Sequence, residues 1–175
     1  MTKARHFPWR TLIAVQIAVS VIATTMVVDL PTKLVWNASA SVPIGLYAIR
    51  PIERLEVADL VLARPPEPLA AFLADGGYVP LGVPLLKRVA ALPGQTVCRD
   101  GREVTVDGVT LAVARERDRM GRPLPHWNGC RSLVDGEVFL LNRDAPSSLD
   151  GRYFGPLPAN AIVGRASLIW AREAD

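Results

Sequence analysis

Glycine and proline are the residues that most restrict what this chain can fold into. The sequence contains 15 prolines and 13 glycines, and all of them except Pro8 lie after residue 28. Proline removes a backbone donor and glycine weakens a helix interior, so a chain interrupted this often cannot build long helices. We therefore predict a mainly β domain of short strands and turns after residue 28.

Several elements of this domain can be placed. Mostly apolar runs of strand length occur at 57–63, 137–141 and 161–170. Asp107-Gly108 lies between two alternating runs and predicts a hairpin over 104–111. One short helix is expected at 68–75, ended by Gly76-Gly77. The more polar segment 99–135 is expected to form a small inserted lobe.

An uncharged, mostly apolar stretch at residues 11–28 precedes the domain. Its 18 residues are at the short end for a spanning helix. The cations that precede it are Lys3, Arg5 and Arg10. By the positive-inside rule, residues 1–10 are expected in the cytoplasm and residues 29–175 outside it. We expect a single-pass anchor in the cell inner membrane, with a periplasmic domain in contact with the lipid bilayer.

A cleaved signal peptide is the competing interpretation of the N-terminus. Ala38-Ser-Ala40 has the small-x-small pattern of a leader peptidase site. The apolar region is longer than the usual leader core and lies about a dozen residues before that site, which favours a retained anchor. Both interpretations export the domain.

Export determines how the two cysteines are interpreted. In an oxidising compartment, Cys98 and Cys130 are expected to form a disulfide that closes a loop of about thirty residues. Two unpaired buried thiols are the alternative. The chain has no Cys-x-x-Cys and only two histidines, so we expect neither a metal site nor a cofactor.

The formal net charge of +3 does not indicate a nucleic-acid partner. Arg115-Glu-Arg-Asp-Arg119 alternates in sign, which is typical of a solvated face rather than a phosphate-binding stripe. The sequence also has no Gly-rich phosphate loop. We therefore expect no nucleic acid to bind.

The use of lysine singles out Lys87. The chain has 17 arginines and three lysines, and Lys87 is the only lysine after Lys33. It lies in the apolar run 84–93. Burial disfavours the charged amine, so its pKa of roughly 10.4 would move towards neutrality and the amine could accept a proton. The alternative is a lysine whose stem covers apolar surface and whose head stays in water.

Ser41 is the candidate nucleophile. A serine needs a proton acceptor, usually histidine, before it can attack a carbonyl. His6 would lie across the membrane from Ser41, which leaves His126 or the amine of Lys87. A Ser-Lys dyad is favoured over the histidine, and a plain turn serine is the structural alternative. Asn37-Ala-Ser39 also matches a glycosylation acceptor pattern.

The segment 142–155 is a third polar cluster, directly after an apolar strand. Its Ser and Asp side chains could orient the lysine amine, and Asp150 could form a charge-assisted pair with Arg152. An ordinary surface turn has the same composition.

Taken together, three segments resemble those of type I signal peptidases, in particular the conjugative-transfer (TraF-type) branch of this serine-lysine family. They occur in the family's order and read Ser41-Val-Pro-Ile-Gly-Leu-Tyr47, Leu86-Lys-Arg-Val-Ala-Ala-Leu-Pro-Gly94 and Ser148-Leu-Asp-Gly-Arg-Tyr-Phe-Gly155. Housekeeping members have two residues between the serine and the proline, and Gly151 replaces a commoner serine.

The resemblance implies a signal-peptidase-like β-fold and a role for each matching residue. Ser41 is expected as the nucleophile and Lys87 as the neutral general base. Ser148 would hydrogen-bond the amine. The oxyanion would be stabilised by the backbone N–H of Ser41 and the hydroxyl of Ser39. The C-terminal segment would be held in shape by Asp150 and Arg152.

The expected function is that of a membrane-bound serine endopeptidase acting on pre-proteins. The expected substrates are pilin-like precursors of a conjugation or secretion system, cut after small residues. One alternative is a peptide ligase or cyclase that uses the same acyl-enzyme. The other is a non-catalytic, membrane-anchored assembly factor of the same apparatus.

Overall fold

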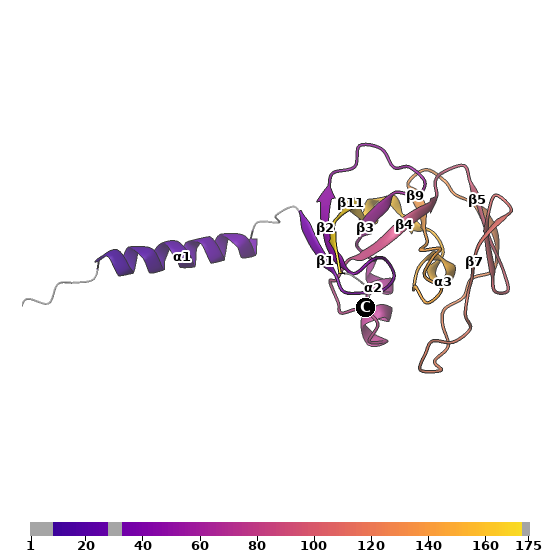
Figure 1. Ribbon diagram of the computed structural model, residues 1–175, viewed down its shortest axis with the longest axis horizontal. Helices are drawn as coiled ribbons and strands as arrows, with labels where there is room; N and C mark the ends of the chain where they lie inside the picture. The colour runs from indigo at the N-terminus through magenta and orange to yellow at the C-terminus, as the bar shows by residue number, and fades with distance from the viewer. Residues whose placement is uncertain (1–8, 28–32, 173–175) are drawn as a thin grey trace, which may run out of the picture. The chain divides into compact units, whose positions relative to one another are not determined.

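The computed structural model describes residues 9–27 and 33–172, and the chain divides into two compact units, 1–32 and 33–175. The first unit contains helix α1, Trp9–Val27 (Figure 1). Among the described residues, no helix combines the length and the apolar character needed to cross a membrane. The anchor expected at 11–28 is therefore not shown. The expected cytoplasmic residues 1–8, and residue 28, lie outside the described part.

The second unit is mainly β, and its larger sheet has seven antiparallel strands in the order β1-β2-β11-β3-β4-β9-β10. Its strands are β1 Leu34–Asn37, β2 Gly45–Arg50, β3 Leu60–Ala63, β4 Leu85–Ala91, β9 Glu137–Leu140, β10 Leu157–Pro158 and β11 Ile162–Ala171. Three short helical elements connect them: α2 Glu67–Asp75, α3 Gly151–Phe154 and the 3-10 turn η1 Ala159–Ala161. The mainly β prediction is therefore confirmed.

A second sheet of four strands, ordered β7-β6-β5-β8, lies beside the β9 end of the larger sheet (Figure 1). Its strands are β5 Thr96–Asp100, β6 Glu103–Val106, β7 Val109–Val113 and β8 Gly129–Ser132. A shared apolar cluster joins the two sheets, with Val97 and Val104 from the small sheet packed with Ala91 and Phe139 from the larger one. The small sheet thus spans 96–132, which overlaps the segment expected to be inserted.

Strand β11 brings the two ends of the domain together. It pairs with β2 on one side and with β3 on the other, so the C-terminal strand sits between two strands from the first half of the domain. Gly45, at the start of β2, lies opposite Ala171. A Cβ at Gly45 would collide with the carbonyl oxygen of Trp170, so this close approach requires glycine.

The local predictions have mixed outcomes. The hairpin is confirmed, because Asp107 and Gly108 both have positive φ, 49° and 78°, between β6 and β7. The helix is also confirmed; it ends at Asp75, and Gly76 is its C-cap residue. The predicted start of the strand at residue 57 is wrong. Residues 56–59 form a turn in which the N–H of Asp59 donates to Glu56 O and Ala58 has φ 75°, so the strand begins at Leu60.

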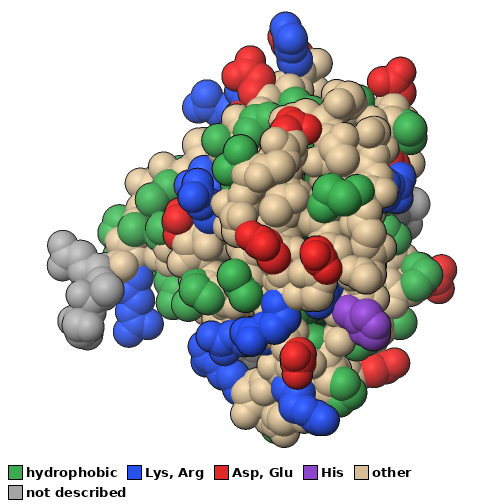
Figure 2. Space-filling model, turned by 90° about the vertical axis from the view of Figure 1, so that its right-hand side faces the viewer, with side chains coloured by type: hydrophobic (Ala, Val, Ile, Leu, Met, Phe, Trp, Pro, Cys, Tyr) green, Lys and Arg blue, Asp and Glu red, His purple; other side chains and the backbone are tan. Residues whose placement is uncertain are grey.

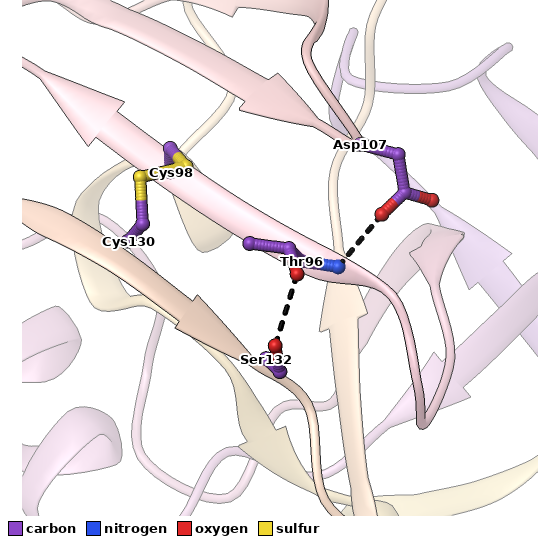
Figure 3. Close-up of a disulfide and its surroundings, with 5 residues drawn as sticks. All are labelled: Thr96, Cys98, Asp107, Cys130 and Ser132. Atoms are coloured by element: carbon purple, nitrogen blue, oxygen red, sulfur yellow. Dashed lines mark hydrogen bonds between the residues drawn. A yellow bond between two sulfur atoms is a disulfide. The ribbon is translucent and has the colours of Figure 1, made fainter.

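The predicted disulfide is present. Cys98 and Cys130 are directly opposite each other on β5 and β8 and are bonded, with the two Cα atoms 4.0 Å apart (Figure 3). Two residues further along, the hydroxyls of Thr96 and Ser132 lie 2.9 Å apart, and the N–H of Thr96 donates to Asp107. The disulfide and the hydrogen bond between Thr96 and Ser132 tie β8 to β5.

The surface of the molecule carries charges of both signs. On the face shown in Figure 2, acidic and basic side chains both occur, with apolar side chains between them. Exposed ion pairs of this kind include Arg131 with Glu137 and Arg165 with Asp59. Such exposed pairs contribute little to stability.

Replacing both cysteines, Cys98→Ser with Cys130→Ser, should lower the free energy of unfolding by about 3 to 4 kcal/mol. The bond joins residues 32 apart in sequence, and losing it restores conformational freedom to the unfolded chain. Denaturant unfolding under oxidising conditions measures the difference. Adding a reductant should lower the stability of the wild type and leave that of the variant unchanged. Equal unfolding midpoints for oxidised wild type and variant would contradict the prediction.

Candidate active site

Ser41 lies in the loop between β1 and β2, and buried Asn37 sets the shape of this loop. The Asn37 amide nitrogen donates to three carbonyl oxygens, at 2.8 Å in Ser39 and 3.1 Å in both Val42 and Pro43. Its oxygen accepts from the N–H and the hydroxyl of Ser39. With its amide used in this way, Asn37 is a structural residue of the loop rather than a glycosylation acceptor.

The hydroxyl of Ser41 is oriented by Ser39. The two Oγ atoms lie 2.9 Å apart. A hydroxyl has one hydrogen, and Ser39 donates its own to Asn37 at 3.0 Å, so Ser39 accepts from Ser41. Within residues 33–172, the backbone N–H of Ser41 has no hydrogen-bond partner. This N–H is therefore available to an oxygen atom of a substrate.

Lys87 lies in the middle of β4 and is only 5% exposed. Its Nζ donates a 2.7 Å hydrogen bond to Ser148 Oγ. Desolvation lowers the pKa of Lys87 from 10.5 to about 8, while the Asp150 carboxylate raises it and the Arg152 guanidinium lowers it further. The prediction of a buried amine is confirmed, and the alternative of a head in water is wrong.

Asn142 holds the backbone on both sides of Lys87, and sequence reasoning missed it. Its Nδ2 donates to Leu86 O at 3.1 Å, and its Oδ1 accepts from the N–H of Arg88 at 3.0 Å. This side chain therefore fixes the segment of β4 that carries the amine. The signal available in the sequence was its position as the first residue of the cluster 142–155.

Asp150 and Arg152 form a buried ion pair behind the lysine, with Nε and Oδ1 2.8 Å apart. Arg152 also donates to the carbonyl oxygen of Asn142 at 2.8 Å, and the other oxygen of Asp150 accepts from the N–H of Asn142. Arg99, in the small sheet, donates to the carbonyl oxygen of Arg152 at 2.7 Å. The surface-turn interpretation of this segment is therefore wrong. Arg99 is a second residue that sequence reasoning missed.

Gly151 occurs where the family more often has serine, and the packing explains the difference. A Cβ at this position would lie 2.6 Å from Phe139 Cε2 and 2.7 Å from Leu140 O. The carbonyl oxygen of Gly151 also accepts from the indole N–H of Trp127 at 3.0 Å. The aromatic ring of Phe139 thus fills the space that a serine side chain would need.

Two cavities meet at Ser41. The larger groove, of about 790 Å³, is lined by Ser39, Ser41, Lys87 and Ser148 among others, and the second, of about 580 Å³, lies on the side of Arg88. Among the hydrogen bonds of residues 33–172, Lys87 Nζ bonds to Ser148 and not to Ser41.

His126 is exposed and lines neither cavity, so the structure does not bring it to Ser41. In the described ranges, no group of three or more His, Cys, Asp or Glu side chains is placed to hold a metal ion.

The substitution Lys87→Met should stabilise the protein at pH 7. The folded pKa of about 8 lies below the ordinary 10.5, so a buried charge opposes folding by about 3 kcal/mol below pH 8. Loss of the hydrogen bond to Ser148 offsets about 1 kcal/mol of this gain. Between pH 8 and 10.5 the unfolded state binds more protons, so wild-type stability rises and the advantage of the variant shrinks.

Thermal or denaturant unfolding from pH 7 to 10 measures this change. Lys33→Met is the matched control, because Lys33 is exposed, and its effect should not vary over the same range. A difference between Lys87→Met and wild type that stays constant with pH would overturn the assignment of a desolvated amine.

Comparison with known proteins gives the family. The profile described as "Signal peptidase, peptidase S26" matches residues 6–171. The chain is 38% identical over 140 residues to the "Probable conjugal transfer protein TraF" of Sinorhizobium fredii, covering 74% of this chain and 73% of the relative. It is 33% identical over 147 residues to the "Plasmid transfer protein TraF" of Escherichia coli, covering 81% of this chain and 79% of the relative.

One further relative and one solved structure are signal peptidases by name. The "Probable signal peptidase I-1" of Synechocystis sp. is 35% identical over 112 residues, 63% of this chain and 52% of the relative. A solved signal peptidase I from Enterococcus faecalis aligns with 65% of this chain and 97% of its own, at 21% identity and a TM-score of 0.39. Because the profile spans nearly the whole sequence and the TraF relatives cover about three quarters of it, the chain belongs to the signal peptidase family, peptidase S26.

Proposed function

We propose that this protein is a serine endopeptidase in which Ser41 is the nucleophile and Lys87 the general base. The observation that carries the proposal is the buried amine of Lys87, with its pKa lowered to about 8, in the same groove as Ser41. At pH 7 roughly one amine in ten is then neutral and able to accept a proton. Membership of the signal peptidase family supports the same reaction.

The chemistry follows from the groups present. Neutral Lys87 takes the proton from Ser41 as its Oγ attacks the substrate carbonyl, which gives a tetrahedral oxyanion. The unpartnered N–H of Ser41 donates to this oxygen, and Ser39 adds its hydroxyl after turning away from Asn37. Protonated Lys87 then gives its proton to the leaving amine, and an acyl-enzyme remains. Water attacks this ester with Lys87 again as the base.

Other residues hold this pair in place. Ser148 accepts from the amine and keeps it at one position in the groove. The ion pair of Asp150 and Arg152 fixes the segment that carries Ser148, and Asn142 fixes the strand that carries the lysine. These residues act through Lys87.

Pre-proteins are the proposed substrates, in particular pilin-like precursors of a conjugation or secretion system. The names of the TraF relatives, which are conjugal and plasmid transfer proteins, support this choice. An extended peptide fits a groove that runs past Ser41. The disulfide supports a location of the domain in an oxidising compartment such as the periplasm. The exposed, stacked rings of Trp36 and Trp170, 5.8 Å apart, suit contact with a lipid bilayer.

The two alternative functions differ from this one in the fate of the acyl-enzyme. A ligase or cyclase would form the same ester and transfer it to an amine, so its product has one water less than the hydrolysed product. A non-catalytic assembly factor would form no ester. The buried amine argues against the assembly factor, because a scaffold gains nothing from a destabilising desolvated charge.

The variants Ser41→Ala and Lys87→Ala should each reduce precursor processing by at least about 1,000-fold, because each removes one half of the proton-transfer pair. The measurement is cleavage of a pilin-like precursor in membranes, with the product identified by mass spectrometry. Ser132→Ala, in the small sheet, is a control serine that should process normally. Normal processing by Lys87→Ala would leave the assembly factor as the better function.

The pH dependence of cleavage should report the same amine. Because only neutral Lys87 can act as the base, kcat/KM should rise about tenfold per pH unit below pH 8 and level off above it. The rise follows the pKa of about 8 in the free enzyme. A profile that is flat between pH 6 and 9 would show that another group takes the proton.

A further inference from the structure

The second cavity beside Ser41 is lined by three arginines, Arg88, Arg143 and Arg172, and we call it the arginine pocket. It has a volume of about 580 Å³, and among residues 33–172 its one acidic lining residue is Asp144. Three cationic side chains and one anionic side chain therefore line the same cavity as the proposed nucleophile. Neither the resemblance to the family nor the mechanism above uses this charge.

The guanidinium groups in the arginine pocket are largely unpaired. Within residues 33–172, the side chains of Arg143 and Arg172 have no hydrogen bond or ion pair, and Arg88 donates only to Ala58 O at 3.1 Å. Arginines also line the larger groove. There Arg122 pairs with Asp118 and Arg117 donates to Gly121 O at 2.7 Å, while the side chain of Arg115 has no hydrogen bond or ion pair within residues 33–172. The arginine pocket therefore offers guanidinium groups without a protein partner next to Ser41.

The two cavities suit different parts of a substrate. Apolar side chains such as Leu73, Leu86 and Leu124 line the larger groove, which also contains Lys87. Small and apolar residues before the cleaved bond fit there. A peptide that passes Ser41 then extends the segment after the bond into the arginine pocket. This assignment rests on the proposed endopeptidase function.

We infer that the arginine pocket binds a carboxylate on the segment released after the cut. Arginine is suited to this role because its planar guanidinium matches a carboxylate with two parallel N–H donors. The carboxylate is either an acidic side chain of that segment or its free C-terminus. Arg143 and Arg172 are the residues that select it, and an amide at the same position lacks the charge.

Synthetic peptides test the inference directly. Each peptide carries Ala-x-Ala before the cut and, after it, a short segment with Glu or Gln at the second position and a C-terminal acid or amide. For wild type, kcat/KM should be higher for a peptide that carries the carboxylate than for its uncharged partner. The difference should be up to about fivefold for each arginine that binds the carboxylate, the size expected for a partly exposed ion pair. The Glu and Gln pair and the acid and amide pair show which carboxylate is bound. High salt should reduce the preference.

The variants Arg143→Gln and Arg172→Gln should each lower kcat/KM for the preferred peptide by up to about fivefold. Their kcat/KM for the uncharged peptide should equal that of wild type. Arg64→Gln is the matched control, since Arg64 is exposed and lines neither cavity. Equal cleavage of all four peptides by wild type would overturn the inference while leaving the endopeptidase intact.

A binding assay separates failure of this inference from failure of the proposed function. Fluorescent versions of the peptides are titrated into the Ser41→Ala protein, which keeps both cavities. If no peptide is cut by wild type, the endopeptidase proposal fails for this substrate class. Tighter binding of the carboxylate peptide, weakened by Arg143→Gln, still supports the arginine pocket, and equal binding of all peptides rejects it.

Discussion

The structure of the site depends on keeping one amine away from water. Lys87 is 5% exposed and lies opposite buried Val61 of β3, and desolvation is the largest influence on its pKa. Asp150 and Arg152 act on the amine with opposite signs. Because the two are paired with each other at 2.8 Å, their fields partly cancel at Nζ, and burial decides the result. An unpaired Asp150 would hold the lysine in its charged form.

The buried ion pair has a structural role of its own. A buried pair is stabilising only if the remaining donors and acceptors are also satisfied. Here the guanidinium of Arg152 reaches the carbonyl oxygen of Asn142, and Asp150 accepts from the N–H of the same residue. Asn142 in turn bonds to β4 on both sides of the lysine. The pair, the asparagine and the strand therefore form one connected polar network that positions the amine.

The fold and the site could be predicted from the sequence to different extents. Gly and Pro spacing predicted a mainly β domain, Asp107-Gly108 predicted the hairpin, and the scarcity of lysine predicted the burial of Lys87. These features are local, so their cause is visible in a short stretch of sequence. The anchor was predicted from the length of the uncharged stretch 11–28 and the cations before it, and among the described residues no helix long and apolar enough to cross a membrane is found.

The missed residues share a physical reason. Asn142 and Arg99 act by bonding to backbone atoms, and they reach across 54 and 53 residues of sequence. A side chain that bonds to a distant carbonyl leaves no pattern of spacing, because the backbone acceptor is the same at every residue. The pairing of β11 with both β2 and β3 is equally invisible, since it joins strands from opposite ends of the domain whose paired residues are 99 or more positions apart in sequence.

Reactivity and instability have the same cause in this site. The desolvation that brings the pKa of Lys87 to about 8 makes the amine a usable base, and it also makes the folded state less favourable whenever the amine is charged. A better hydrated lysine would stabilise the fold and would also leave the amine protonated at neutral pH. The dense hydrogen bonding of Asn142, Asp150 and Arg152 offsets this destabilisation without adding charge at the amine itself. The disulfide stabilises the small sheet by an independent route, so the domain can retain an unfavourable buried group where the reaction requires one.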